Sequence, residues 1–234
     1  MRAGFVAMSP PRLALVGTDT AVGKTTVACA LLAQASAAGV RVLPFKPAQS
    51  GNDRPSDAQR LLAALTNDDA LDEAAIAPLR YELPLAPGIA DDPTRFTTAS
   101  AVDLPPLHRC VDALDVLVAR TRPDLVLVEP AGGLWVPMPG GSWQPQWLRA
   151  LATHTIVIGR AGLGAINAAL LTIDALRALD LAPLAFILCE TTPRDPSNDA
   201  NADVIARARS LPHLGTIPHD GAPPPLFAPL FAML

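Results

Sequence analysis

Charged residues are scarce in this sequence. Lysine, arginine, aspartate and glutamate together make up 17% of its 234 residues, whereas soluble domains typically contain about 25%. The net charge is −4, and the basic side chains form no stripe along the chain. Domains that bind nucleic acid usually carry such a stripe of positive charge, so we expect no nucleic acid among the partners.

Long uninterrupted apolar runs are also missing, although 50% of the residues are hydrophobic. A membrane-spanning helix needs about 20 apolar residues in succession. The uncharged stretch 25–40 is shorter than that, and the stretch 161–189 is interrupted by charged residues. The apolar run at the N-terminus is too short for a signal peptide. We therefore expect a cytoplasmic protein that makes no contact with a membrane.

Cysteine is rare, with three residues spread over the chain and no spacing typical of a metal site. Cys29 and Cys110 fall in helical patterns, which predicts buried thiols and fits a reducing, cytoplasmic compartment. No linker, internal repeat or break in composition divides the sequence. We therefore predict a single domain over residues 1–234, since this length suits one domain with a substantial core.

The sequence does contain a regular alternation of apolar runs and helical patterns. The apolar runs predict strands at 13–16, 40–45, 124–128, 153–158, 183–188 and 214–217. The helical patterns cover 24–38, 57–65, 107–121, 164–179 and 198–210, with a further short helix at 68–73. The proline-rich segment 81–106 is predicted to be mostly loop, and the apolar end 221–234 to pack on the body. This alternation predicts an α/β fold whose parallel sheet is covered by helices on both faces.

The first predicted strand leads into the segment GTDTAVGKTTVA, residues 17–28. A phosphate-binding loop usually reads G-x-x-x-x-G-K-[ST], but here one additional residue separates Gly17 from Gly23. The free backbone N–H groups where the next helix begins attract an anion, helped by the helix dipole. Lys24 suits the β- and γ-phosphates of a nucleotide, and the Thr25 hydroxyl suits Mg²⁺. The segment predicts a nucleotide-binding loop of unusual spacing.

Three further clusters follow predicted strands. Glu129 ends the strand DLVLV, where a P-loop protein needs a carboxylate for its metal ion, and glycines follow at 132 and 133. Lys46 and Ser50 lie in FKPAQSG after the second strand, at the sheet edge where ligands bind. The proline after Lys46 restricts the backbone of that lysine. GLGAIN, residues 162–167, is either a second anion-binding helix start or a plain tight turn.

Together these clusters resemble the dethiobiotin synthetase family, which is similar to P-loop NTPases. The family carries GTDTxVGKT, with the same additional residue, and KPxxSG, which matches residues 46–51. Its SDA segment matches residues 56–58, and its VExAGG segment matches residues 128–133. GLGxIN followed by LLT matches residues 162–167 and 170–172. The resemblance runs from about Leu13 to Pro218, which is most of the chain.

The resemblance implies a specific ligase reaction. Diaminopelargonate (7,8-diamino form) and CO₂ would give a carbamate, ATP would convert it to a carbamic-phosphoric anhydride, and the second amine would close the ring of dethiobiotin. Lys24 and Lys46 match the catalytic lysines that neutralise phosphate and carbamate charge. Mg²⁺ would be held by Thr25, Asp57 and Glu129.

The remaining implied roles concern nucleotide and substrate. Positions that match the family's nucleotide site are Ala21, Val22, Gly23, Lys24, Thr25, Thr26, Asp57, Glu129, Pro130, Ala131, Gly132, Cys189, Glu190 and Pro218. Thr20 and Ser50 match positions that line the substrate. Gly162, Leu163, Gly164 and Asn167 match a loop that holds the substrate carboxylate across a dimer interface, so the resemblance also implies a homodimer.

Several residues depart from the family pattern. Pro130 replaces a glycine, Ala21 a frequent glutamate, and Gly88 and Ala168 replace histidines. The pair Cys189-Glu190 stands where the family has an asparagine that reads adenine, and a thiol lacks the two-sided hydrogen bonding of an amide. Nucleoside triphosphates other than ATP and a related substrate therefore also fit this sequence.

Two other functions fit the same fold. An amidoligase-like enzyme that activates another carboxylate with ATP fits Gly88 and Ala168, which fall around the predicted substrate site. A partition or switch ATPase fits the loop, although such proteins usually carry a second lysine near its start, where residues 18–20 read Thr-Asp-Thr. ATP hydrolysis that responds to a protein or DNA but ignores the diamine would favour the ATPase.

Overall fold

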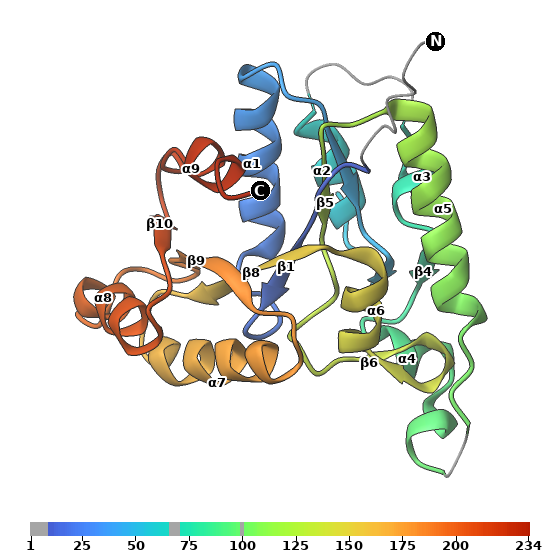
Figure 1. The fold of residues 1–234 in the computed structure, drawn as a ribbon. Coiled ribbons are helices and arrows are strands. Elements are labelled where there is room, and N and C mark those ends of the chain that lie inside the picture. Colours follow the sequence, from blue (N-terminus) through green and yellow to red (C-terminus); the bar gives the residue numbers. More distant parts are fainter. Residues whose placement is uncertain (1–8, 66–70, 99–100) are drawn as a thin grey trace.

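The computed structural model describes residues 9–65, 71–98 and 101–234. Its main sheet contains six strands in the order β10-β9-β8-β1-β5-β2, and every pair in it is parallel (Figure 1). These strands are β1 (Arg12–Gly17), β2 (Val42–Phe45), β5 (Leu125–Val128), β8 (His154–Arg160), β9 (Pro183–Cys189) and β10 (His213–Ile217). All six were predicted, with boundaries that differ by at most two residues.

The helices are α1 (Lys24–Ala37), α2 (Asp57–Ala63), α3 (Glu73–Ile76), α4 (Pro87–Asp91), α5 (Pro105–Thr121), α6 (Gln144–Leu151), α7 (Ala165–Ala178), α8 (Asn198–Arg209) and α9 (Phe227–Phe231). Two short 3₁₀ turns accompany them, η1 (Pro93–Phe96) and η2 (Pro139–Gly141). Two small sheets complete the fold, a parallel pair of β3 (Ala48–Ser50) and β4 (Leu79–Tyr81), and an antiparallel pair of β6 (Pro137–Met138) and β7 (Ser142–Trp143).

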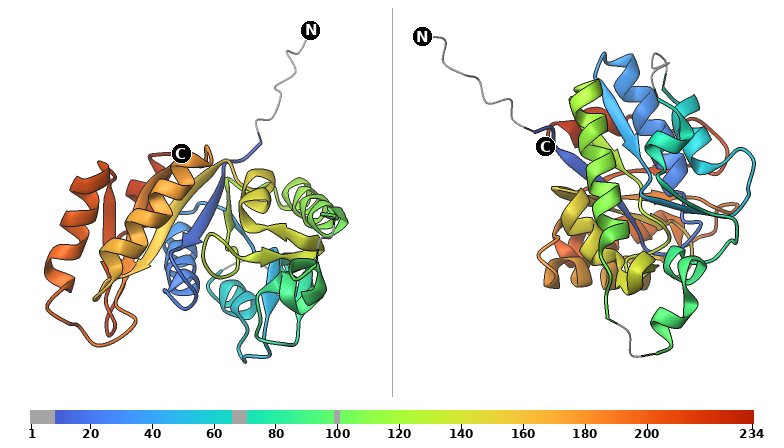
Figure 2. Two further views of the ribbon diagram at one scale, coloured as in Figure 1. Left: turned by 90° about the horizontal axis from the view of Figure 1, so that it is seen from below. Right: turned by 90° about the vertical axis from the view of Figure 1, so that its right-hand side faces the viewer.

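Helices cover both faces of the main sheet because its strand order reverses direction. The chain moves from β1 to β2 in one direction, and from β2 through β5, β8 and β9 to β10 in the other. Since crossovers between parallel strands are right-handed, α1 lies on one face, and α5 to α8 lie on the other. Figure 1 shows α1 and α7 on opposite sides of the sheet, and Figure 2 adds views along two other directions. The predicted fold class is confirmed.

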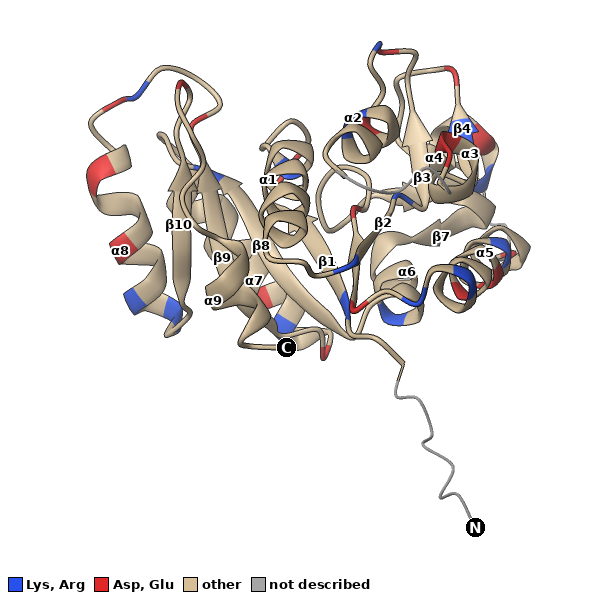
Figure 3. Ribbon diagram, turned by 90° about the horizontal axis from the view of Figure 1, so that it is seen from above, with Lys and Arg blue, Asp and Glu red and all other residues tan. Residues whose placement is uncertain are grey.

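The buried core consists of the strands and the helix faces that pack on them. The side chains of β1 from Leu13 to Val16 and all those of β5 are buried. Charged residues are sparse along the sheet and gather on peripheral helices such as α5 and α8 (Figure 3). The low charged fraction of the sequence therefore reflects a large α/β core in which the strands are apolar on both sides.

Several local predictions were wrong or incomplete. The segment 81–106, predicted as mostly loop, contains α4 and η1, and the helix α6 was not predicted at all. Of the short helix predicted at 68–73, residues 71 and 72 are not helical and Glu73 begins α3, while residues 66–70 lie outside the described residues. Cys110 is buried as predicted, but Cys29 is only partly buried. The N-terminal stretch that we judged too short for a signal peptide falls partly in residues 1–8, also outside the described residues.

The C-terminal run packs on the body as predicted. Leu226, Phe227 and Leu230 are buried, and α9 lies against α1. Gln34 of α1 ties the two together, because its Oε1 accepts hydrogen bonds from the backbone N–H groups of Leu226 and Phe227, and its Nε2 donates to Pro224. Within the described residues, no helix is long and apolar enough to span a membrane.

Substituting Gln34→Ala should destabilise the protein by about 2 kcal/mol, because the partly buried backbone groups of the C-terminal segment lose their partners. Urea unfolding would measure the loss, with Ser36→Ala on the same helix as a control, since the Ser36 side chain makes no hydrogen bond among the described residues. Equal stability of the two variants would show that the C-terminal segment contributes little to the fold.

Candidate active site

The predicted site residues meet at the carboxyl edge of the main sheet. β2 pairs with β5 so that Phe45 lies beside Val128, and the backbone N–H of Glu129 donates to the carbonyl of Phe45. The residues that follow these two strands, Lys46 and Glu129, are therefore neighbours. They line a cavity of about 730 Å³ beside the loop that joins β1 to α1. The cavity lies where an open parallel sheet is expected to bind a ligand.

The loop between β1 and α1 has the backbone of an anion-binding helix start. Gly23 immediately precedes α1 and has a φ of 97°, and the non-glycine residue Ala21 has a φ of 54°. A side chain at position 23 would also collide with Cys189, because an added Cβ atom would lie 2.6 Å from its Sγ. Glycine is therefore required here both by its backbone geometry and by its close neighbour.

A buried cluster of charges lies below this loop. The Nζ of Lys46 is 2.8 Å from Oε1 of Glu129 and 2.7 Å from Oδ2 of Asp57. Thr25 Oγ1 donates a hydrogen bond of 2.7 Å to the same Glu129 oxygen. Burial alone would lower the pKa of Lys46, but the two carboxylates outweigh it and raise this pKa above its usual value. The ammonium of Lys46 is therefore charged and fixed in place.

Lys24 is in a different electrostatic situation. Its Nζ donates to the backbone carbonyls of Gly132, at 2.7 Å, and Asp19, at 3.4 Å, and makes no ion pair within the described residues. Burial lowers the pKa of Lys24 to about 8, against the attraction of Glu129. Lys24 and Lys46 are the only lysines in the sequence. Both therefore serve this one cavity, one paired with carboxylates and one held by carbonyl oxygens.

The residues around Glu129 fit a magnesium ion. Glu129 is 1% exposed, yet its Oε2 has no hydrogen-bond partner in the structure. This oxygen, the Thr25 hydroxyl and the carboxylate of Asp57 are hard oxygen donors that converge next to the loop. Mg²⁺ is usually bound by one or two carboxylates together with phosphate oxygens and water. Within the described residues, no group of three or more acidic, histidine or cysteine side chains could hold a metal ion without further ligands.

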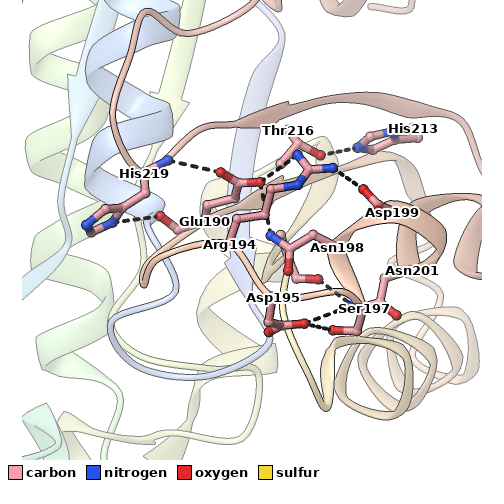
Figure 4. A network of polar contacts seen from close by, with 11 residues as sticks. Glu190, Arg194, Asp195, Ser197, Asn198, Asp199, Asn201, His213, Thr216 and His219 are labelled. Atoms are coloured by element: carbon pink, nitrogen blue, oxygen red, sulfur yellow. Dashed lines mark hydrogen bonds and ion pairs between the residues drawn. The ribbon is translucent and has the colours of Figure 1, made fainter.

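The opposite end of the cavity is formed where β9 and β10 end. The Glu190 side chain accepts hydrogen bonds from Asn198 Nδ2 at 3.0 Å, from Arg194 at 3.3 Å and from the backbone N–H of His219 at 3.3 Å (Figure 4). The bond from Asn198 contributes most to a lowered pKa of Glu190. Burial raises the pKa of the Cys189 thiol to about 12, so it stays protonated. This end presents a neutral thiol, and the ionised carboxylate is already bound by internal donors.

Most predicted nucleotide and substrate residues line the cavity. They are Thr20, Ala21, Gly23, Lys24, Thr25, Thr26, Lys46, Ser50, Asp57, Glu129, Pro130, Ala131, Gly132, Cys189, Glu190 and Pro218. Val22 does not line it, because its side chain is buried beneath the loop. The cavity lining also includes the segment Pro84–Pro87, which directly precedes the Gly88 placed around the substrate site above, and residues that sequence reasoning missed, among them Asp53, Arg60 and His219. Only Arg60 had a usable signal, since it lies three residues after Asp57 and so on the same helix face.

The turn 162–167 lies outside this cavity. Its backbone is held by the neighbouring helix start, because Leu163 N donates to Asp195 Oδ2 and Asn201 Nδ2 donates to the carbonyls of Ala161 and Gly162. Leu163 is 90% exposed. Gly162, Leu163, Gly164 and Asn167 are thus not brought to the nucleotide cavity of their own chain.

A second cavity of about 510 Å³ adjoins the first through Thr20, which lines both. Its walls are the loop 18–20, the segment 133–136 and the face of α7 that carries Leu171 and Thr172. Trp135 and Leu171 are large apolar side chains in this wall and are more than half exposed. The TDT half of the loop therefore lies between the nucleotide-sized cavity and a partly apolar one.

Comparisons with known proteins show which family this chain resembles. A family model described as an AAA domain matches residues 11–222. The chain is 40% identical over 213 residues to a protein of Anaeromyxobacter sp. (strain Fw109-5) named ATP-dependent dethiobiotin synthetase BioD, covering 88% of this chain and 89% of that protein. It is 30% identical over 211 residues to ATP-dependent dethiobiotin synthetase BioD 1 of Escherichia coli (strain K12), covering 88% and 90%. This chain belongs to the dethiobiotin synthetase family.

Solved structures support the fold of this dethiobiotin synthetase family member. The signal recognition particle 54 kDa protein of Aeropyrum pernix K1, in complex with GDP, aligns with a TM-score of 0.56 at 15% identity, covering 94% of this chain and 43% of that one. Chloroplast FtsY from Physcomitrella patens aligns with a TM-score of 0.54 at 15% identity, covering 93% and 60%. The P-loop NTPase-like fold predicted from the sequence is confirmed.

The different environments of the two lysines predict opposite effects on stability. Lys24→Met should stabilise the ligand-free protein below pH 8 by up to about 3 kcal/mol, because a buried charge that lacks an ion pair is removed. Between pH 8 and about 10.5 the folded protein releases this proton before the unfolded chain does, so wild type gains stability and the advantage of the variant shrinks.

Urea unfolding at pH 7 and at pH 10.5 would measure the difference. Lys46→Met is the matched control and should destabilise the protein, because it leaves the buried Glu129 carboxylate unpaired. A Lys24→Met effect that does not change with pH would contradict the assigned environment of Lys24.

Proposed function

We propose that this chain catalyses the ATP- and Mg²⁺-dependent carboxylation and ring closure of 7,8-diaminopelargonate with CO₂ to give dethiobiotin. Membership of the dethiobiotin synthetase family supports an ATP-dependent ligase, and the cavity supports this particular reaction. The observation that carries the proposal is the pair of lysines in one cavity, with Lys46 fixed between Asp57 and Glu129. Two anions, a triphosphate and a carbamate, must meet in this reaction, and fixed cations reduce their repulsion.

Each residue then has a role that follows from its position. The N–H groups where α1 begins and Lys24 bind the phosphate chain. Lys46 holds the carbamate oxygen close to the γ-phosphate, so that this oxygen attacks phosphorus and ADP departs. The second amine of the diamine then attacks the carbamate carbon of the anhydride, and phosphate leaves as the ring closes. Mg²⁺ bound by Thr25, Asp57 and Glu129 would neutralise charge on the phosphate oxygens.

Ser50 supports the placement of the diamine. Its hydroxyl oxygen is buried, lines the cavity and has no hydrogen-bond partner in the structure. A buried hydroxyl without a partner costs free energy, which a polar substrate group can recover. Thr20 faces both cavities, so a long substrate whose reacting amines lie near Lys46 would extend past Thr20 into the second, partly apolar cavity.

A nucleotide assay with purified protein tests the function. With Mg-ATP, diaminopelargonate and bicarbonate together, we expect ADP and a ureido product in equal amounts, and neither when the diamine is omitted. Lys46→Ala should lower kcat at least about 100-fold, the loss typical when a charge-stabilising group is removed. Circular dichroism would confirm that the variant is folded.

Other outcomes of this assay would favour the alternatives. ADP formation that requires a different carboxylate and an amine would indicate the amidoligase-like enzyme. ADP formation that ignores the diamine but is stimulated by a protein or by DNA would indicate a partition or switch ATPase. Substantial turnover by Lys46→Ala would refute the role of Lys46.

A homodimer completes the proposed site. The turn 162–167 lies outside the cavity of its own chain, and Leu163 is the most exposed of the large apolar residues described. The apolar side chains of Trp135 and Leu171 lie in the wall of the second cavity. A second copy that covers this surface would bury these side chains and bring its own turn toward the far end of the substrate, where the carboxylate lies.

Leu163→Glu should weaken self-association and raise the KM for diaminopelargonate, because a charge replaces an apolar side chain at the proposed interface. Sedimentation velocity over a range of concentrations would measure the first effect and steady-state kinetics the second. Val116→Glu on α5 is the matched control, since Val116 is similarly apolar and 64% exposed. A Leu163→Glu protein that matches this control in both measurements would argue against the interface.

A further inference from the structure

Arg60 lines the same cavity as the two lysines but lies on a different element. It is in the first two turns of α2, three residues after Asp57, and this spacing places the two side chains on one helix face. The backbone there is firmly held. Ser56 and Gln59 form a capping box at the start of α2, and both bond to Glu73. Arg60 thus projects from a fixed helix start into the cavity.

The Arg60 side chain has no hydrogen bond among the described residues, in contrast to both lysines. It forms an ion pair with Asp57, with 3.9 Å between Nη1 and Oδ1, which is too long for a hydrogen bond. The other oxygen of Asp57 is already paired with Lys46. The Arg60 side chain is 43% exposed and lines the cavity, so it is accessible to a ligand there. A planar guanidinium with free donors is the group best suited to bind a phosphate through two parallel hydrogen bonds.

The position of Arg60 selects which phosphate it reaches. Asp57, Glu129 and Thr25 mark the end of the cavity that would hold a metal ion, and a metal ion there would neutralise charge on the outer phosphates of a bound nucleotide. Arg60 lies one helical turn from Asp57, at this end of the cavity, whereas Cys189 and Glu190 form another part of its wall. A guanidinium at the metal end is close to the outer phosphates and remote from a base held near Cys189.

We propose that Arg60 is a third cation of the site and binds the outer phosphates of the nucleoside triphosphate directly. Lys46 is committed to two carboxylates and Lys24 to two backbone carbonyls, so Arg60 supplies the donors that neither lysine offers before a ligand arrives. This inference rests on the proposed function only in that a nucleoside triphosphate occupies the cavity. It does not depend on which substrate the activated phosphate attacks.

Binding measurements on the complete chain test this role without any turnover. Isothermal titration with ATP in the presence of EDTA should show binding about tenfold weaker for Arg60→Gln than for wild type, the loss expected for a charged hydrogen bond. The affinity for AMP, which lacks the outer phosphates, should be unchanged. Arg60→Lys keeps the charge but loses the planar, two-donor guanidinium, so its affinity for ATP should lie between those of wild type and Arg60→Gln.

Arg80→Gln is the matched control. Arg80 is similarly exposed, at 50%, and makes a similarly long ion pair with Glu73, 3.7 Å, but it does not line the cavity. ATP affinity equal to that of this control would overturn the proposal. Equal loss of ATP and AMP affinity would also overturn it, as would a loss that appears only with Mg²⁺, because Arg60 would then act through Asp57.

The same experiment separates this inference from the proposed reaction. If Arg60→Gln lowers the affinity for ATP but not for AMP, and no ureido product forms in the assay, the role of Arg60 in phosphate binding stands and the proposed reaction fails. If the ureido product forms and Arg60→Gln binds ATP as wild type does, the reaction stands and the role of Arg60 is refuted. Thermal unfolding of each variant would show that the change in affinity is not a loss of folded protein.

Discussion

The ion cluster of Lys46, Glu129 and Asp57 is the interaction on which the site depends. A carboxylate as deeply buried as Glu129 is stable only with a partner, and Lys46 is its partner. The three residues come from the ends of β2 and β5 and the start of α2, so the cluster ties these elements at one point. The same charges that stabilise the ligand-free site are those that the metal ion and the two anionic substrates of the proposed reaction would require.

The loop between β1 and α1 adds binding groups without adding charge pairs. Its second half, Gly-Lys-Thr at residues 23–25, presents the backbone N–H groups where α1 begins. Gly23 lies against Cys189, so the loop is close to the end of β9. Its TDT half contributes Thr20 to both cavities. The additional residue that distinguishes this loop from an ordinary P-loop therefore lies in the half that faces both the nucleotide cavity and the proposed path of the substrate.

The sequence was sufficient to predict the main sheet and most of the cavity, because both depend on local patterns. Buried parallel strands are continuous apolar runs, and their ends carried Lys46 and Glu129. The helix α6 and the short pair β3–β4 were missed, since their stability comes from contacts with distant segments. For example, α6 packs against β1 and α5, which lie far from it in the sequence. Arg60 was missed because its place in the cavity wall depends on how α2 packs, and the turn 162–167 lies outside the cavity of its own chain.

The most direct measurement uses the fact that the sequence contains only two lysines. In protein labelled with ¹⁵N at the lysine side chains, an NMR pH titration would report the two ammonium groups separately. We predict that Lys24 loses its proton near pH 8 and that Lys46 keeps its proton above pH 10.5. Two lysines that titrate together near pH 10.5 would contradict the buried ion cluster, and with it the prearranged cations on which the proposed chemistry rests.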